Sequence, residues 1–469
     1  MVFNYKKMLF LDPAVIDSSE NVDLRVCQPR DRQIVITPDK PWEKNGYITF
    51  FSSVIKDNGV YRMYYTNNTD DENVKGGILY AESKDGYHWE KPELGLVSYK
   101  GSKANNMLEI LAKDGSVIFE PDAPEEERYK FFMHHYTKGT FVHTSADGIH
   151  WKLSDKPLCN FMLDSQNVAF FDKRINKYVY YLRGWPLNPY KEGKHHRTVV
   201  RGETDDIFKP LEYDKSLTKI FRGDNQPAIG DGEFPDVFAI DELDWYDTDI
   251  YTMMPTPYSE AEGYYLAFPS FFRHGYNHKS DGKLEVMFAG SSDGIHWHRY
   301  DRSAYVQNEV FGRFYNNIAF MGLGVHREGD RLLQYGTILG SRHGAGAERM
   351  GNPDAGGKIV CYEQRLDGFV CAKFAVEGGS LTTCPWECTG TELVVNVDAG
   401  MLGYLKIGIY NEDNSVIEGY TIDDCKIIEE NGIDVKVTFN GGDLKQLNGK
   451  KIRLKIEGAN ARLFSLKMQ

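Results

Sequence analysis

Three acidic residues stand at or just before the start of apolar, alternating stretches that we expect to be β-strands. Glu43 precedes residues 47–54, Asp164 precedes residues 167–171, and Asp249 opens residues 249–254. If the strands bring these acids together, one carboxylic acid can protonate a leaving oxygen while a carboxylate attacks or activates water. A third acid can tune the pKa of the first through like-charge repulsion. We therefore expect Asp164 to be the nucleophile or base, Glu43 the general acid and Asp249 the pKa tuner of a glycoside-cleaving site.

Polar and aromatic residues in or near the same segments are candidate substrate ligands. Arg183 ends an apolar stretch and Arg197 opens the next, and a buried arginine needs a carboxylate partner, for which Asp164 is suitable. His343 lies in a glycine-rich loop, residues 340–348, where it can bind a sugar hydroxyl. The side chains that we expect to contact substrate are Trp42, Asn167, Arg183, Arg197, Tyr251 and His343.

Three further acids lie on segments that can reach the same site. Glu233 and Asp236 belong to the long segment before residue 249, and Glu348 belongs to the glycine-rich loop. Each is an alternative to one of the three acids above.

A repeated motif, Ser-x-Asp-Gly-x-His-Trp, indicates the architecture. It occurs at residues 83–89, 145–151 and 291–297, with degenerate copies at 203–208 and 365–369. The Asp-Gly pair favours a tight turn, because glycine tolerates positive φ and aspartate can bond the backbone two residues on. The tryptophan can then anchor the outer strand against its neighbour. We assign no catalysis to the histidines and aspartates of these turns.

Apolar stretches with alternation precede each turn, and we expect one more strand after it. The expected strands are 47–54, 60–65 and 77–82; 116–120, 129–135 and 140–144; 167–171, 178–183 and 198–202; 249–254, 263–268 and 284–289; and 317–325, 331–337 and 358–364. Five similar hairpins would also suit a β-sandwich, but near-identical turns at whole-repeat spacing favour radial repetition. The sequence therefore predicts an all-β chain with a five-bladed β-propeller over residues 1–374.

Residues 375–469 lack the turn motif and predict a separate accessory domain. Their short alternating stretches are 392–397, 404–410, 434–439, 451–456 and 462–467. Turn signals such as Asn440-Gly441-Gly442 separate them. We expect a β-sandwich that packs on the propeller and braces it.

Composition excludes several classes of partner. The net charge of −13 and the lack of a basic tract argue against nucleic acid. No apolar run is long enough to span a bilayer or to act as a secretion signal, which favours a cytoplasmic protein. Cys384 and Cys388, with three residues between them and no second pair nearby, are interpreted as packing thiols, so we expect no metal and no cofactor.

The repeats, the acids and the trailing domain together resemble the five-bladed glycosidases related to glycoside hydrolase families 32 and 43. Stretches such as Tyr80-Ala-Glu-Ser-Lys-Asp-Gly-Tyr-His-Trp-Glu-Lys-Pro92 look like family-32-like bacterial members. The resemblance covers the whole chain and implies hydrolysis of oligosaccharides, with furanosides such as arabinofuranosides or fructosides as substrates. The fructosidase motif Trp-x-Asn-Asp-Pro-Asn-Gly is absent, and the Glu comes first among the three acids rather than after two Asp residues.

Other interpretations remain open. A glycoside phosphorylase needs a cationic phosphate site beside the acids, which Arg183, Arg197 and His343 can supply. A non-catalytic carbohydrate-binding propeller predicts that each acid is paired and that no pocket is open. A sialidase is the weakest alternative, because sialidase propellers have six blades and their turn motif carries an extra residue between Asp and Gly.

Overall fold

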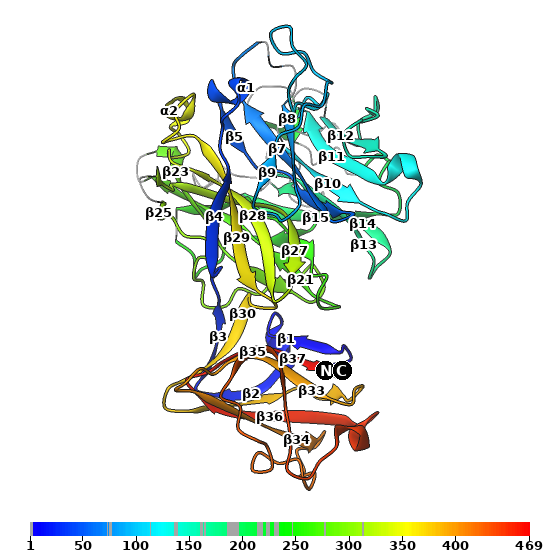
Figure 1. Ribbon diagram of the computed structural model, residues 1–469, viewed down its shortest axis with the longest axis vertical. Coiled ribbons are helices and arrows are strands. Elements are labelled where there is room, and N and C mark those ends of the chain that lie inside the picture. Colours follow the sequence, from blue (N-terminus) through cyan, green and yellow to red (C-terminus); the bar gives the residue numbers. More distant parts are fainter. Residues whose placement is uncertain are drawn as a thin grey trace.

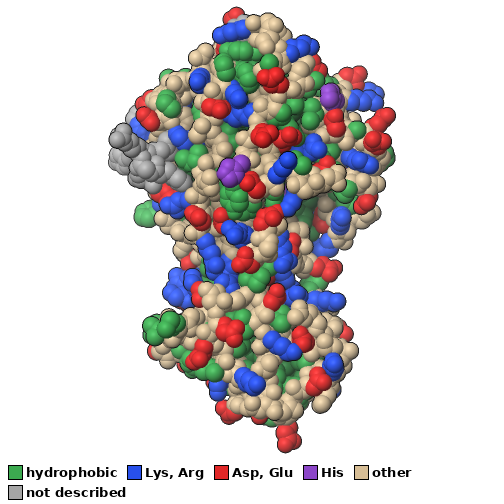
Figure 2. Space-filling view, in the orientation of Figure 1, with side chains coloured by type: hydrophobic (Ala, Val, Ile, Leu, Met, Phe, Trp, Pro, Cys, Tyr) green, Lys and Arg blue, Asp and Glu red, His purple; other side chains and the backbone are tan. Residues whose placement is uncertain are grey.

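The structure, a computed structural model, describes residues 3–72, 74, 77–112, 114–135, 139–159, 163, 166–184, 197–212, 219–221, 226–228, 234–245, 247–275, 278–311 and 314–469. Nearly all of its regular elements are β-strands, as the sequence predicted, and they form two units (Figure 1). The upper unit contains residues 31–365, and the lower unit contains residues 3–26 and 370–469. Figure 2 shows a narrower waist between them, where lysine and arginine side chains gather.

Five antiparallel groups of strands follow one another along the upper unit, and we call them sheets one to five. Sheet one contains β5 (Tyr47–Thr49), β6 (Val54–Asp57), β7 (Val60–Asn68), β8 (Ile78–Ser83) and β9 (Trp89–Glu90). Sheet two contains β10 (Gly115–Phe119), β11 (Tyr129–His135) and β12 (Gly139–Ser145). Sheet three contains β13 (Val168–Asp172), β14 (Lys177–Gly184), β15 (Thr198–Thr204) and β18 (Asp236–Phe238).

Sheets four and five complete the upper unit. Sheet four contains β19 (Thr248–Thr252), β22 (Ser270–Gly275) and β23 (His278–Val286), and β20 (Thr256–Pro257), β21 (Tyr265–Ala267) and β24 (Ala289–Ser291) form a separate small sheet in the same part of the chain. Sheet five contains β27 (Ile318–Glu328), β28 (Arg331–Leu339), β29 (Gly357–Arg365) and β4 (Asp31–Ile36). A parallel bridge between Leu284 of β23 and Ile318 of β27 joins sheets four and five into one continuous sheet. The remaining elements here are α1 (Pro41–Lys44), α2 (Gly346–Arg349), η2 (Glu125–Glu127) and the hairpins β16 (Lys219–Phe221) with β17 (Gln226–Ala228) and β25 (Val310–Phe311) with β26 (Phe314–Tyr315).

The last strand of sheet five differs from the prediction. We expected it after the turn at residues 365–369, but that segment leads into the lower unit, and β4 from the start of the chain pairs with β29 instead. The fifth sheet is therefore completed by two segments more than 300 residues apart in the sequence. This pairing ties the beginning of the upper unit to its end.

Hydrogen bonds at or near the first strands link several of the sheets to one another. The Ser53 hydroxyl accepts a hydrogen bond from Val117 N at 2.9 Å, and the Ser116 hydroxyl accepts one from Ala169 N at 2.9 Å. From the fifth sheet, Leu323 N donates to Ser52 O at 2.9 Å. These bonds connect sheets one, two and three and link sheet five back to sheet one.

The repeated turns clamp neighbouring sheets. In each turn the Asp accepts two backbone N–H groups and its second oxygen lies 2.7 Å from the Nδ1 of the His, as for Asp147 and His150. The carbonyl of each turn glycine accepts a hydrogen bond from a tyrosine of another sheet: Tyr335 to Gly86 at 2.9 Å, Tyr64 to Gly148 at 3.0 Å and Tyr181 to Gly294 at 2.6 Å. The tryptophan of each motif packs edge-on against the same tyrosine. The prediction that these tryptophans anchor their strands against a neighbour is confirmed.

The lower unit consists of two sheets that share one core. The first contains β1 (Lys7–Leu9), β3 (Val22–Val26), β30 (Val370–Phe374), β33 (Leu393–Asp398), β35 (Asn431–Lys436) and β37 (Arg462–Met468). The second contains β2 (Ile16–Glu20), β31 (Gly379–Thr383), β32 (Trp386–Glu387), β34 (Tyr404–Asn411) and β36 (Lys451–Ala459). Two short turns, η1 (Pro13–Val15) and η3 (Leu444–Leu447), complete it.

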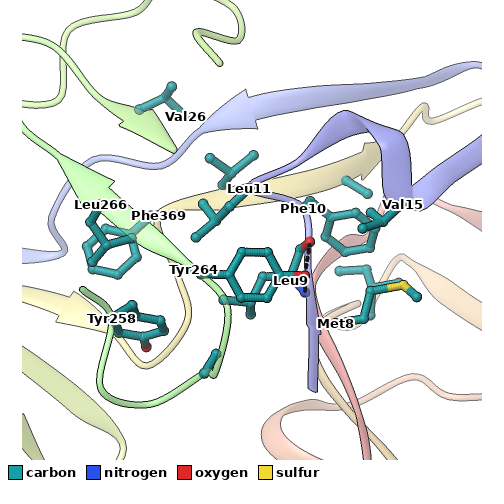
Figure 3. Close-up of a cluster of buried hydrophobic side chains, with 14 of the residues drawn as sticks. Met8, Leu9, Phe10, Leu11, Val15, Val26, Tyr258, Tyr264, Leu266 and Phe369 are labelled. Atoms are coloured by element: carbon teal, nitrogen blue, oxygen red, sulfur yellow. Dashed lines mark hydrogen bonds between the residues drawn. The ribbon is translucent and has the colours of Figure 1, made fainter. Parts of the chain in front are cut away.

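The predicted division of the chain at residue 374 is corrected at its N-terminal side. Strands β1, β2 and β3 pair with β37, β31 and β30 of the lower unit, so residues 7–26 do not belong with the upper sheets. Because β-strands pair without regard to sequence distance, residues 7–26 alone gave no sign of this partner. The N-terminal segment also contacts the upper unit, as Figure 3 shows for Leu9 and Tyr264. Leu9 N donates a hydrogen bond to the Tyr264 hydroxyl at 3.0 Å, and this hydroxyl donates to Leu9 O at 3.2 Å.

Candidate functional site

Asp249, one of the three predicted acids, is held in place by an arginine and a histidine side chain. Its carboxylate accepts hydrogen bonds from Arg197 Nη1 at 2.8 and 2.6 Å, and His274 Nε2 lies 3.3 Å away. The Asp249 side chain is 1% exposed. Burial raises the pKa of the Asp249 carboxyl, but the bond from His274 and the charge of Arg197 outweigh it, so this pKa lies below its usual range. Asp249 is therefore a fixed carboxylate and not a proton donor.

Tyr251, two residues further along β19, is surrounded by basic side chains. The guanidinium groups of Arg183 and Arg197 lie 5.4 and 5.1 Å from the centre of its ring, and Arg183 Nη2 donates to its carbonyl at 3.3 Å. The Tyr251 hydroxyl lies 3.1 Å from His343 Nε2. Phe272 packs between His274 and His343, with ring centres 4.1 and 4.7 Å away. We call these residues the Tyr251 cluster: Arg183, Arg197, Asp249, Tyr251, Phe272, His274 and His343.

Three sheets supply this cluster at one end of their strands. Arg183 lies near the end of β14 and Arg197 precedes β15 in sheet three, while β19 and β22 of sheet four carry Asp249, Tyr251, Phe272 and His274. His343 comes from the loop after β28 of sheet five. Five residues predicted for the site, Arg183, Arg197, Asp249, Tyr251 and His343, thus come together, although up to 160 residues separate them. His274 was missed, because an isolated histidine at a strand end carries no signal.

The upper unit also has an open pocket of about 670 Å³. Its wall contains the polar side chains Asn67, Asn68, Asp70, His134 and His135 together with Tyr47. Tyr47 and Tyr251 pack against the same apolar group, which includes Phe272, Phe320 and Leu339. Arg349 also connects the two places, since its guanidinium lies 5.4 Å from the Tyr47 ring and its Nη2 donates to His343 O at 2.9 Å. Tyr47 and Arg349 thus link the wall of the pocket to the Tyr251 cluster.

Asp236 lies at the same end of sheet three. The Thr198 hydroxyl donates to its carboxylate at 2.6 Å, and Thr198 directly follows Arg197 of the cluster. Asp236 is exposed. The sequence named Asp236 only as an alternative acid, and the structure places it at the end of sheet three that carries Arg197.

Asp114 is an acid that the sequence analysis did not name. It stands directly before β10, which begins at Gly115, as the predicted acids stand at or before the starts of other strands. Its side chain is buried, and the nearby Ala112 lines the open pocket. A signal was present in the sequence, since Asp114 lies two residues before the predicted strand 116–120.

Glu43, predicted as the general acid, lies in a closed network. Its carboxylate accepts hydrogen bonds from Lys91 Nζ at 2.7 and 3.0 Å, from the Tyr65 hydroxyl at 2.7 Å and from the backbone N–H groups of Asp39 and Lys40. The Glu43 side chain is fully buried, and these donors occupy both of its oxygens. This geometry does not support a proton-donating role, and it shows instead a structural ion pair that fixes α1.

Two predicted substrate ligands are also buried. Trp42 Nε1 donates to Asn106 Oδ1 at 2.9 Å, and its ring packs edge-on against Tyr99, which gives it a packing role. Asn167 is 1% exposed beside the start of β13. Its neighbour Gln166 is also buried, at 4% exposure.

The other predicted acids are placed as follows. Asp164 and Glu233 lie outside the described residues. Glu348 is exposed on α2, between Ala347 and Met350 of the pocket wall. Among the described residues, no group of three or more His, Cys, Asp or Glu side chains could hold a metal ion. In the same part of the chain, no helix is long and apolar enough to cross a membrane.

No family model and no curated protein matches the chain. Solved structures that are similar to it include a complex of BT0996 with RGII, with a TM-score of 0.45 and 12% identity over 74% of this protein and 93% of that one. A glycosyl hydrolase from Bacteroides ovatus has a TM-score of 0.42 and 14% identity over 73% of this protein and 94% of that one. A structure described under the GH130 family of mannoside phosphorylases has a TM-score of 0.41 and 13% identity, covering 74% of this protein and 94% of that one. At identities and TM-scores this low, the similarities assign neither a fold nor an activity to this protein.

Proposed function

We propose that the upper unit is a five-bladed β-propeller, that the two sheets of the lower unit form a β-sandwich, and that the protein is a glycoside hydrolase. The observation that supports the proposal is the Tyr251 cluster, which holds Asp249 at the same end of the strands as Asp236 and is linked through Tyr47 and Arg349 to the open pocket. Two acids, an aromatic ring and polar side chains near a pocket are what sugar recognition and glycoside cleavage require. The bonds that run from sheet to sheet and back to sheet one support the propeller.

The acids take the following roles in this proposal. Asp236, which is exposed, replaces Glu43 as the general acid. Asp164, which directly follows Leu163, remains the nucleophile or base. Asp249 stays ionised and orients Arg197 while its charge raises the pKa of the acid that shares the site. Asp114, directly before β10 and two residues from Ala112 of the pocket wall, is a further carboxylate near the pocket.

Substrate recognition follows from the wall of the pocket. The amides of Asn67 and Asn68 and the imidazole of His135 can donate to and accept from sugar hydroxyls. Tyr47 offers an aromatic face. The furanoside class, arabinofuranosides or fructosides, rests on the family resemblance alone and sets the first compounds to assay.

A glycoside phosphorylase is the second candidate, and the basic side chains around Tyr251 favour it. Arg183, Arg197 and His343 are the residues that were expected to supply a phosphate site, and they lie together. In that reaction phosphate takes the place of water as the nucleophile. A protein that only binds carbohydrate would have each acid in an ion pair and no open pocket. In the structure Glu43 and Asp249 are each in an ion pair, but an open pocket is present as well.

An activity screen tests the proposal. The wild type and the variants Asp236→Asn, Asp164→Asn and Glu43→Gln are incubated with aryl glycosides and oligosaccharides, with and without inorganic phosphate. We expect wild type and Glu43→Gln to release sugar, and the two Asp variants to lose at least a hundredfold in rate while their thermal unfolding stays cooperative. Activity that requires phosphate would select the phosphorylase. Silence across the panel, with ligand-induced thermal shifts, would select the binding protein.

A further inference from the structure

A cysteine lies in or next to each of the two connections between the upper and lower units. Cys27 follows β3 on the path to β4, and Cys371 lies in β30, shortly after the path from β29. Both thiols are free. Figure 1 shows these strands side by side at the waist.

The strand register brings the two side chains to one face. Strands β3 and β30 are antiparallel with Arg25 opposite Cys371, and Cys27 N donates to Phe369 O at 2.9 Å. Because side chains alternate along a strand, residues 25 and 27 point to the same side as Cys371. The Cys27 sulfur leans back along its own strand and lies 3.7 Å from Arg25 O, which brings it toward the position opposite Cys371. Cys27 and Cys371 are therefore diagonal neighbours on one face of the strand pair.

Small molecules can reach this pair. Cys27 and Cys371 both line a cavity of about 1080 Å³ between the units, and its wall also carries Arg25, Lys373 and Arg462. Cys27 is half-buried and Cys371 is 1% exposed. A hydrogen bond from the Cys371 thiol lowers the pKa of the Cys27 thiol. The lower pKa and the greater exposure of Cys27 make it the better nucleophile of the two.

We propose that Cys27 and Cys371 form a reversible disulfide across the waist, made by exchange with a low-molecular-weight disulfide such as oxidised glutathione. The Cys27 thiolate attacks one sulfur of the reagent and releases the first glutathione thiolate. The Cys371 thiolate then attacks the Cys27 sulfur of the mixed disulfide and releases the second. The two protein thiols lose two protons and two electrons, and two molecules of reduced glutathione carry both away.

The bond would fasten the strand pair that completes sheet five. Cys27 lies just before β4, and Cys371 lies just after β29, the strand with which β4 pairs. A disulfide here closes a loop around the whole upper unit and restrains the unfolded chain, most effectively for long loops in the chain-entropy description. The oxidised protein should therefore keep β4 on β29 under conditions that release it in the reduced protein.

Thiol counting and unfolding test this proposal. The reduced wild type has seven thiols, and we expect five after equilibration with oxidised glutathione, with a cross-linked peptide containing Cys27 and Cys371. The Cys384→Ser variant, a matched control, should go from six to four, whereas Cys27→Ser and Cys371→Ser should form no intramolecular bond. The urea midpoint of the upper unit should rise on oxidation in wild type and not in Cys27→Ser.

Two outcomes would overturn the proposal. Seven thiols remaining in oxidised wild type, or a bond between Cys384 and Cys388 instead, would exclude the pair. A Cys27–Cys371 bond with an unchanged unfolding midpoint would refute its role in fastening β4. Thiol counting and the urea midpoint can both be measured on oxidised and reduced wild type. The test therefore does not depend on whether a cysteine variant folds.

Discussion

The clamp between the turn of residues 145–151 and Tyr64 gives a prediction for Gly148→Ala. Gly148 has a φ of +75°, and an added Cβ would lie 2.4 Å from the Tyr64 hydroxyl and 3.1 Å from the Tyr129 ring. The left-handed backbone costs an L-residue about 1–2 kcal/mol. Displacing the buried Tyr64 hydroxyl from Gly148 O loses the hydrogen bond and leaves both groups without it, at about 1–3 kcal/mol more. We expect Gly148→Ala to lower the free energy of unfolding by about 2–5 kcal/mol.

Gly59→Ala is the matched control. Gly59 has nearly the same φ, +79°, but an added Cβ would meet nothing within 4 Å. This variant should lose only the backbone component, about 1–2 kcal/mol. The difference between the two variants therefore measures the contact with Tyr64.

Urea denaturation followed by tryptophan fluorescence provides the assay, because Trp151 packs edge-on against Tyr64 at 6.1 Å. The double variant Tyr64→Phe with Gly148→Ala should be less destabilised than the sum of the single variants, since the phenyl ring lacks the oxygen that the Cβ would strike. Equal losses for Gly148→Ala and Gly59→Ala would refute the clamp. It would show that the turn glycines serve the local turn alone.

Three other predictions follow from buried and charged groups. Lys91→Met removes the ion-pair partner of Glu43 and leaves a buried carboxylate without a counter-charge. We expect it to lower the free energy of unfolding, measured by urea titration, by about 3–5 kcal/mol. A loss below about 1 kcal/mol would contradict the stabilising role of the pair. Burial raises the pKa of the Asp147 carboxyl, but the hydrogen bonds from His150 and the backbone lower it to about 2 overall. A carboxyl whose pKa is lowered in the folded state stabilises the fold above its unfolded pKa of 3.8, and this stabilisation is lost as pH falls toward 2. Asp147→Asn should therefore flatten the decline of the urea unfolding midpoint between pH 5 and pH 2. Burial lowers the pKa of His326 to about 4. Because the unfolded state then binds the proton more readily, the protein loses stability as pH falls from 6.5 to 4. The unfolding midpoint of His326→Gln should therefore change less than that of wild type over this interval, and identical pH profiles would contradict this prediction.

The sequence predicted the strands well because their signal is local. Residues 129–135 were expected as a strand and are β11, and the turns at Asp85, Asp147 and Asp293 have the predicted aspartate bonds to the backbone. The origin of β4 and of β1 to β3 in the fold was not predictable, because strand pairing over 300 residues leaves no trace in one sequence.

The candidate site was predictable only in part. Asp249, Arg197 and Tyr251 were found because polar residues inside apolar strands stand out. Glu43 also stood out, but Lys91, its partner, lies 48 residues away and an ion pair of this kind cannot be distinguished from an open acid without coordinates. His274 and the pocket wall were missed for the same reason, since a pocket is made by segments that meet only in the fold.

Comparison of wild type with Asp249→Asn decides whether the Tyr251 cluster takes part in the proposed glycoside cleavage. Both proteins are assayed for new reducing ends on arabinofuranosyl and fructosyl oligosaccharides, with and without phosphate, after their unfolding midpoints have been recorded. We expect wild type to release sugar and folded Asp249→Asn to lose at least a hundredfold in rate, because Arg197 and His274 lose the carboxylate that orients them. Turnover by Asp249→Asn at the wild-type rate would rule out this role of the cluster.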